Sequence, residues 1–188
     1  MDAVSLIANR ISAVNATVHG LVEKAAGLDL VRPVLPGTSP LGLTLWHLPR
    51  VQDWLVNTTI RSVPEVVAGF AGLPDPERFG FGTGLTPDDA AAAARAVDLD
   101  VLLSYADAVT TGILEWLPTL SPADLDWVPP FAERQQTRAS YCTPAALTDV
   151  ASLHGVPVGV LLMRPAISHV FHHAGEVELL IGVAASSA

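Results

Sequence analysis

The sequence is poor in cysteine and in positive charge. Cys142 is the only cysteine, so no disulfide can form within the chain, which fits a reducing cytoplasm. Lys24 is the only lysine, and 10 basic residues stand against 19 acidic ones, which gives a net charge of −9. Proteins that bind nucleic acid usually carry a basic run or patch, and none occurs here. Nucleic acid is therefore not an expected partner.

Long apolar runs and a targeting signal are also missing. The longest apolar segment, 156–162, is far shorter than a membrane span and is soon followed by Arg164. The first five residues contain neither the basic region nor the apolar region of a secretory signal. We therefore expect a soluble cytoplasmic protein that does not enter a membrane.

The overall composition is that of one globular domain. Half of the 188 residues are apolar and 15% are charged, which excludes a disordered chain. This length allows one well-buried core and is too short for two comfortable domains. We therefore expect a single domain over residues 1–188.

Apolar residues recur at steps of three and four, and no stretch alternates in the manner of a β-strand. Proline and small polar residues mark several helix starts. The sequence predicts an all-α bundle with four main helices at 3–26, 40–61, 86–117 and 157–183. Short helices or turns are expected at 65–70, 121–124 and 144–153. Pro49 and Pro165 lie inside two main helices and predict a kink or a loosened turn at each.

Two long connections, 62–85 and 127–143, interrupt this helical pattern. Connections of this length often cover or open a functional site. The first one contains Phe70, Phe79 and Phe81. These rings either close over a pocket or simply pin the loop to the core.

Half of the six histidines fall within residues 167–176. On a helix, His169 and His173 are one turn apart on the same face, with Cβ atoms roughly 5–6 Å apart. Two imidazoles at that separation can bind one divalent metal ion. His47 is the leading third ligand, because it shares a face with Leu43 and Val51. Three imidazoles with open positions are typical of a catalytic site more than of a closed structural one.

Alternatives remain for this cluster. His172 could replace His173 as a partner of His169, although helical phase puts it further toward solvent. Glu176 is expected near the His169 side, where it could orient a ligand or accept a proton. We interpret His19 as a surface residue and His154 as a structural residue at a helix end. The clustered histidines could also be core residues that bind no metal.

Three short motifs resemble the DinB/YfiT-like superfamily of four-helix bundles. They are Trp46-His47-Leu48, His169-x-x-x-His173-x-Gly175-Glu176 and Leu120-Ser121-Pro122-Ala123-Asp124-Leu125. The resemblance covers nearly the whole chain, and it implies a DinB-like bundle with additional short helices and long loops. It also implies that His47, His169 and His173 hold zinc, nickel or a similar divalent ion.

The chain departs from the superfamily pattern in three places. Glu176 stands where many members have glutamine after the glycine. Pro49 is unusual so close to the histidine of the second helix. The segment 127–156 is longer and more irregular than the common pattern.

The resemblance further implies a metal-dependent enzyme that acts on a small molecule. The superfamily includes thiol S-transferases and thiol-dependent isomerases that use low-molecular-weight thiols. A composition rich in Ala, Val, Gly and Pro suggests a genome of high GC content, for which mycothiol is the natural thiol to test. The alternatives are a metal-dependent hydrolase and a non-enzymatic, stress-related bundle. In the second case the protein could be a homodimer, with a vestigial or structural histidine cluster.

Overall fold

The structure, a computed structural model, describes residues 2–138, 141 and 143–186. Cys142 lies outside these described residues. All regular elements within them are helical, and none is a strand, so the all-α prediction is confirmed. No helix in this part of the chain is both long enough and apolar enough to cross a lipid bilayer.

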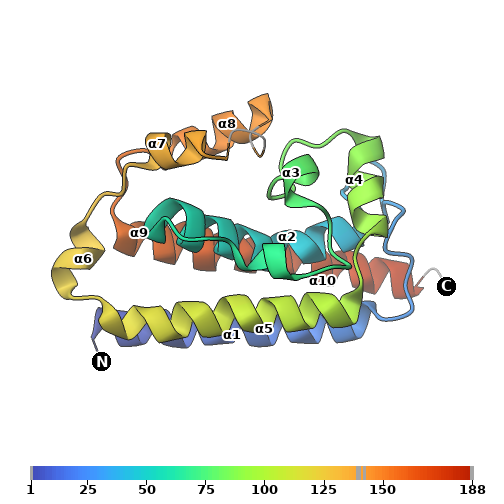
Figure 1. Cartoon of the computed structure of the whole chain (residues 1–188). Helices are drawn as coiled ribbons and strands as arrows, with labels where there is room; N and C mark the ends of the chain where they lie inside the picture. The colour runs from blue at the N-terminus through green and yellow to red at the C-terminus, as the bar shows by residue number, and fades with distance from the viewer. Residues whose placement is uncertain (1, 139–140, 142, 187–188) are drawn as a thin grey trace.

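Four long helical segments form the body of the molecule (Figure 1). The first is α1 (Ala3–Ala25), and the second is α2 (Leu41–Asp53) continued by the π-helical turn η1 (Trp54–Arg61). The third is α5 (Leu99–Trp116). The fourth runs through α9 (Val158–Met163), the π-helical η5 (Arg164–His169) and α10 (Val170–Ser186).

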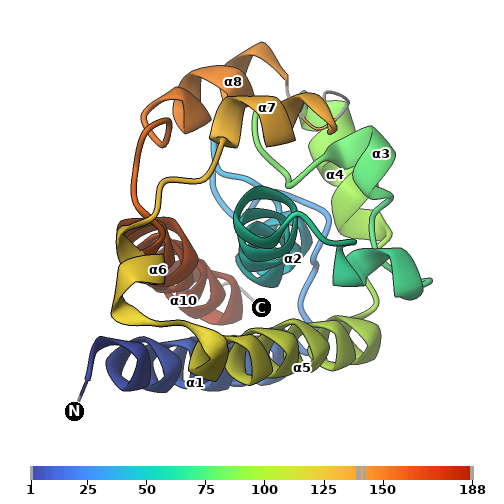
Figure 2. The ribbon, with the colours of Figure 1, turned by 60° about the vertical axis from the view of Figure 1, so that its left-hand side comes forward.

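Helix α2 lies at the centre of the fold. It contacts α1, α4, α5 and α10, and all 13 of its residues are buried. Figure 2 shows α2 enclosed by other elements on every side of its axis. A helix that is buried all round must satisfy its polar side chains within the protein. This requirement governs both the core and the site described below.

The remaining helices are short and connect or cover the long ones. They are η2 (Val66–Gly69), α3 (Pro76–Phe79), α4 (Pro87–Arg95), η3 (Leu117–Thr119), α6 (Pro122–Asp126), α7 (Phe131–Gln136) and α8 (Pro144–Ala151). The expected turns at 65–70 and 121–124 and the helix at 144–153 correspond to η2, α6 and α8. Helices α3 and α7 form within connections that we expected to be irregular.

The single helix predicted at 86–117 is wrong, because the chain forms two helices there. Asp98 caps α5 by accepting hydrogen bonds from the amides of Asp100 and Val101. This cap starts a new helix and leaves α4 free to take its own direction. Helix α4 then packs closely on α2, where a Cβ added at Gly42 would lie 2.9 Å from the carbonyl oxygen of Ala94.

The two internal prolines have different effects on their helices. Helix α2 continues through Pro49 without the loosened turn expected there, and the chain becomes π-helical only from Trp54. Pro165 lies within the π-helical η5, which interrupts the last long helix as expected. Proline lacks an amide hydrogen and crowds the carbonyl four residues earlier, and a wider turn relieves that crowding.

The connection at 62–85 is pinned to the core by its aromatic rings. Phe79 and Phe81 are buried, and the ring of Phe81 stacks on Trp54 with a centroid distance of 4.4 Å. Phe70 packs edge-on against Tyr105. Of the two interpretations of these rings, the structure therefore favours pinning over closure of a pocket.

Candidate metal centre

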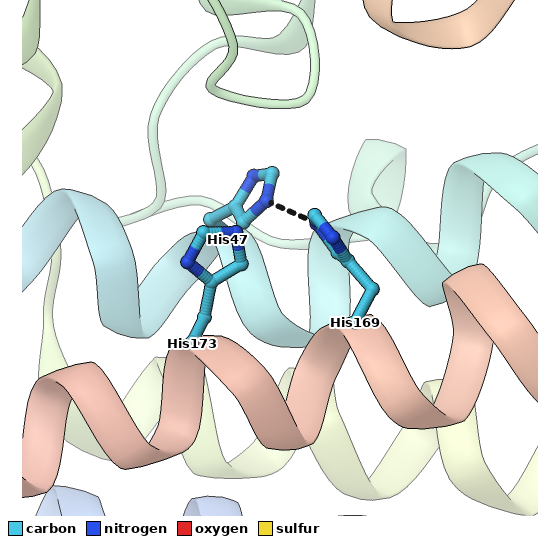
Figure 3. A group of neighbouring side chains, drawn as sticks. All are labelled: His47, His169 and His173. Carbon is cyan, nitrogen blue, oxygen red and sulfur yellow. Dashed lines mark hydrogen bonds between the residues drawn. The ribbon is translucent and has the colours of Figure 1, made fainter. Parts of the chain in front are cut away.

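His47, His169 and His173 converge between α2 and the last long helix (Figure 3). One ligand nitrogen from each ring can be chosen so that all three lie within 4.8 Å of one another. The Nε2 atoms of His47 and His169 are 3.2 Å apart. The predicted convergence is confirmed, and the group could hold a metal ion.

A main-chain carbonyl orients the ring of His47. Its Nδ1 donates a hydrogen bond to the carbonyl oxygen of Phe81 at 2.5 Å, so the proton is on Nδ1 and the lone pair is on Nε2. His47 is 8% exposed, and this burial lowers its pKa to about 3. The ring is therefore neutral at pH 7, as a metal ligand must be.

A carboxylate orients the ring of His173. Nδ1 of His173 donates to Oε2 of Glu176 at 2.6 Å, which leaves Nε2 free to face His47 and His169. A hydrogen bond that the distal ring nitrogen donates to a carboxylate is the usual support of a metal-binding histidine. Glu176 was expected on the His169 side, and this placement is corrected because its carboxylate contacts His173 and His172.

His172 does not belong to the three-histidine group. Its side chain is 70% exposed, and its Nε2 lies 3.2 Å from Oε1 of Glu176. His169, by contrast, is half-buried, and burial followed by the neighbouring His173 lowers its pKa to about 4. The structure therefore pairs His169 with His173, in agreement with the helical phase.

The donor set fits a divalent ion. Zinc binds imidazole nitrogens at roughly 2.0–2.1 Å, so two nitrogens of a tetrahedral site lie about 3.3 Å apart. The 3.2 Å between the Nε2 atoms of His47 and His169 agrees with that spacing. Imidazole donors suit zinc and nickel among the divalent ions.

The π-helical turn η5 carries His169 and is tied directly to α2. The side-chain amide of Gln52 donates to the carbonyl oxygen of Ala166 at 2.8 Å in the protein interior. This bond fixes the two helices relative to each other next to the site. It therefore helps to set the separation of His47 from His169.

A cavity of about 540 Å³ opens beside the three histidines. This volume lies in the range of small-molecule sites, roughly 300–1,000 Å³. Its other walls are mainly leucines, small hydroxyl residues and two acids: Leu35, Gly37, Thr38, Ser39, Leu43, Thr44, Gly82, Thr83, Asp149, Glu176, Leu179 and Leu180. The candidate metal centre thus lies in the wall of a pocket and not in a closed core.

A buried ionic network lies behind the site, and the sequence analysis missed it. Arg50 is fully buried, donates from Nη2 to Glu65 at 2.7 Å, and donates from Nε to the carbonyl oxygen of Gly80 at 3.1 Å. Gly80 directly precedes Phe81, whose carbonyl orients His47. Arg50 therefore supports the loop that positions this ligand. A signal in the sequence was present, since Arg50 lies one turn after His47 and is directly followed by the apolar Val51.

The remaining two histidines lie outside the group, as expected. Nε2 of His19 is 2.8 Å from Oδ1 of Asp107 near the surface. The ring of His154 packs on Phe131, and its Nε2 lies 3.4 Å from Oε1 of Gln135. Neither could complete the three-histidine group.

Comparisons with known proteins add no family to these observations. No family model matches the chain, and no match was found among curated proteins. The relation to the DinB/YfiT-like superfamily therefore rests on the three motifs and stays a proposal.

Gly82 offers a test of how the Phe81 loop supports His47. Gly82 has φ +90°, and a Cβ there would lie 3.3 Å from Nδ1 of His47. We expect Gly82→Ala to displace the Phe81 carbonyl and to weaken zinc affinity by about 10–100-fold, as measured by calorimetric titration.

Gly72→Ala is the matched control, because Gly72 has φ +92° and the atoms nearest to its added Cβ belong to Val101 and Asp98. Both variants carry a similar backbone cost of about 1–3 kcal/mol. The control should nevertheless keep its zinc affinity. Equal affinities in the two variants would contradict a positioning role for the loop.

Proposed function

We propose that the protein is a divalent-metal-dependent enzyme of the DinB-like superfamily. The activity we propose is that of a thiol S-transferase or a thiol-dependent isomerase, with a low-molecular-weight thiol such as mycothiol as co-substrate. Two features support the proposal: the three histidines lie beside an open cavity, and the motifs around them resemble that superfamily. The ligands come from the second and the last of four long helical segments, which agrees with a DinB-like four-helix bundle.

The observation that carries the proposal is the orientation of two rings. His47 and His173 each donate from Nδ1 to a fixed acceptor, which leaves each Nε2 available to one shared point. Structural zinc sites are usually closed by four protein ligands, whereas catalytic sites have three and an open position. Within the described residues, this group has three ligands.

The chemistry that a divalent ion supplies at such a site is a lowered pKa of a bound thiol or water. The chain's own residues prepare the site for it. Glu176 orients His173 and can also receive a proton at its exposed carboxylate. Leu43 and Leu180 supply apolar wall to the cavity beside the histidines.

Metal content and thiol transfer test the proposal together. Protein purified without added metal should contain close to one zinc or nickel per chain by mass spectrometry. It should then conjugate mycothiol to a small electrophile, and His173→Ala should show neither property.

The same assay separates the alternatives. Hydrolysis of esters or amides without any thiol would favour a metal-dependent hydrolase. A full metal complement without thiol transfer or hydrolysis would favour the non-enzymatic bundle.

A further inference from the structure

The cavity beside the three histidines has a negatively charged lining. Its charged lining residues are two acids, Asp149 and Glu176, and no described lysine or arginine lines it. Residues outside the described part of the chain are Met1, Ala139, Ser140, Cys142, Ser187 and Ala188, none of which is basic. Within the part of the chain that the structure describes, the pocket therefore has no guanidinium or ammonium side chain to receive an anion.

The two acids differ in what they contact. The carboxylate of Glu176 is engaged by His173 and His172. Asp149 is exposed on α8, and within the described residues its carboxylate has no hydrogen-bond or ion-pair partner. Asp149 is thus a free negative charge that faces the ligand space.

The uncharged polar groups of the wall are hydroxyls. Thr38, Ser39, Thr44 and Thr83 line the cavity from three different segments. Thr38 and Thr44 donate their hydroxyl hydrogens to the carbonyl oxygens of Leu35 and Pro40. Their oxygens can still accept from the hydroxyl and amide groups of a neutral ligand. Hydroxyls cannot compensate the charge of a carboxylate as an arginine would.

The balance of charges at the site also disfavours a ligand that carries a carboxylate. The two positive charges of a divalent ion bound by imidazoles would be offset by Asp149 and Glu176. A thiolate would already add one negative charge to this neutral set. A further carboxylate on the same ligand would face Asp149 without any compensating cation.

We infer that the cavity selects a thiol whose remaining part is uncharged or positively charged and rich in hydroxyl or amide groups. Asp149 is the residue that discriminates against thiols that carry a carboxylate. The inference rests on the proposed thiol chemistry, and it narrows the class of co-substrate. Small thiols with free carboxylates are then poor ligands of this site.

Two matched probes test this selection directly. N-acetylcysteine and N-acetylcysteine amide have the same thiol and differ in whether the far end carries a charge. Their binding to the cobalt-loaded protein can be followed by the thiolate-to-metal absorption band, without any turnover. We expect the amide to bind at least about tenfold more tightly than the acid at low ionic strength.

The variant Asp149→Asn should reduce that ratio by about threefold or more and leave the affinity for the amide nearly unchanged. Asp126→Asn is the matched control, because Asp126 is an exposed acid on α6, at one end of the molecule (Figure 1), and does not line the cavity. It changes the net charge by the same amount and should keep the wild-type ratio. Thermal unfolding of the cobalt-loaded variants checks that all three proteins are equally folded.

Each other outcome overturns a defined part of the argument. Equal binding of the two probes, or tighter binding of the acid, would reject selection by charge and leave thiol chemistry intact. An unchanged ratio in Asp149→Asn would reject Asp149 as the discriminating residue. Binding of neither probe to the cobalt-loaded protein would reject the proposed thiol function itself, and the inference with it.

Discussion

His173→Ala is expected to weaken zinc or nickel binding by more than about 100-fold. The change removes one of three imidazole donors, and it also deprives Glu176 of the ring that it orients. Loss of a supporting group alone typically costs 10–100-fold in metal affinity, so loss of a ligand should cost more. Calorimetric titration of the metal into the metal-free variant measures the effect.

His172→Ala is the matched control, because it is the adjacent residue and contacts the same carboxylate. Its side chain is 70% exposed, so its removal should change metal affinity by no more than about twofold. Strong binding by His173→Ala with loss of binding in His172→Ala would reverse the assignment. Strong binding by both variants would favour a vestigial cluster.

Arg50→Met is expected to lower the free energy of unfolding by about 3–5 kcal/mol, the usual effect of removing one partner of a buried ion pair. The side chains of Arg50 and Glu65 are 0% and 2% exposed, so the variant leaves a carboxylate in the core without its cation. The change also removes a guanidinium that stacks on Tyr141. Urea unfolding monitored by circular dichroism measures the difference.

Two further variants make this result specific. Arg10→Met removes an exposed arginine from α1 and should change stability by no more than about 0.5 kcal/mol. Arg50→Met combined with Glu65→Leu should recover part of the loss, because it also removes the uncompensated acid. Similar stabilities for Arg50→Met and Arg10→Met would show that the buried pair contributes little.

Local patterns predicted most of the helices. The apolar stripe expected over 3–26 corresponds to α1 at Ala3–Ala25, and the stripe over 157–183 corresponds to the segment from α9 to α10. The spacing of His169 and His173 likewise predicted a shared face. Such features depend on neighbours three or four residues away, so they are visible in the sequence.

Features that depend on distant partners were missed. The break between α4 and α5 depends on one cap, Asp98, in a stretch whose alanines favour a continuous helix. Arg50 binds Glu65, which lies 15 residues later in the sequence. Tyr105 donates a hydrogen bond to Asp53, which lies 52 residues earlier. Side-chain periodicity carries no information about such pairings.

The acceptor that orients His47 was also invisible in the sequence. It is the main-chain carbonyl of Phe81, which lies 34 residues further along the chain. Every residue has such a carbonyl, so its role depends only on where the loop is placed. The same limit applies to Asp149, which reaches the cavity through α8.

The central position of α2 has a consequence for the opening motions of the molecule. Its amides can exchange with solvent deuterium mainly when the surrounding helices α1, α5 and α10 separate, which requires an opening close to global unfolding. Helix α10 exposes part of its surface and can open locally at lower free energy. The metal centre therefore lies between two helices whose amides should exchange at different rates. His47 is on the slowly exchanging α2, and His173 is on the faster α10.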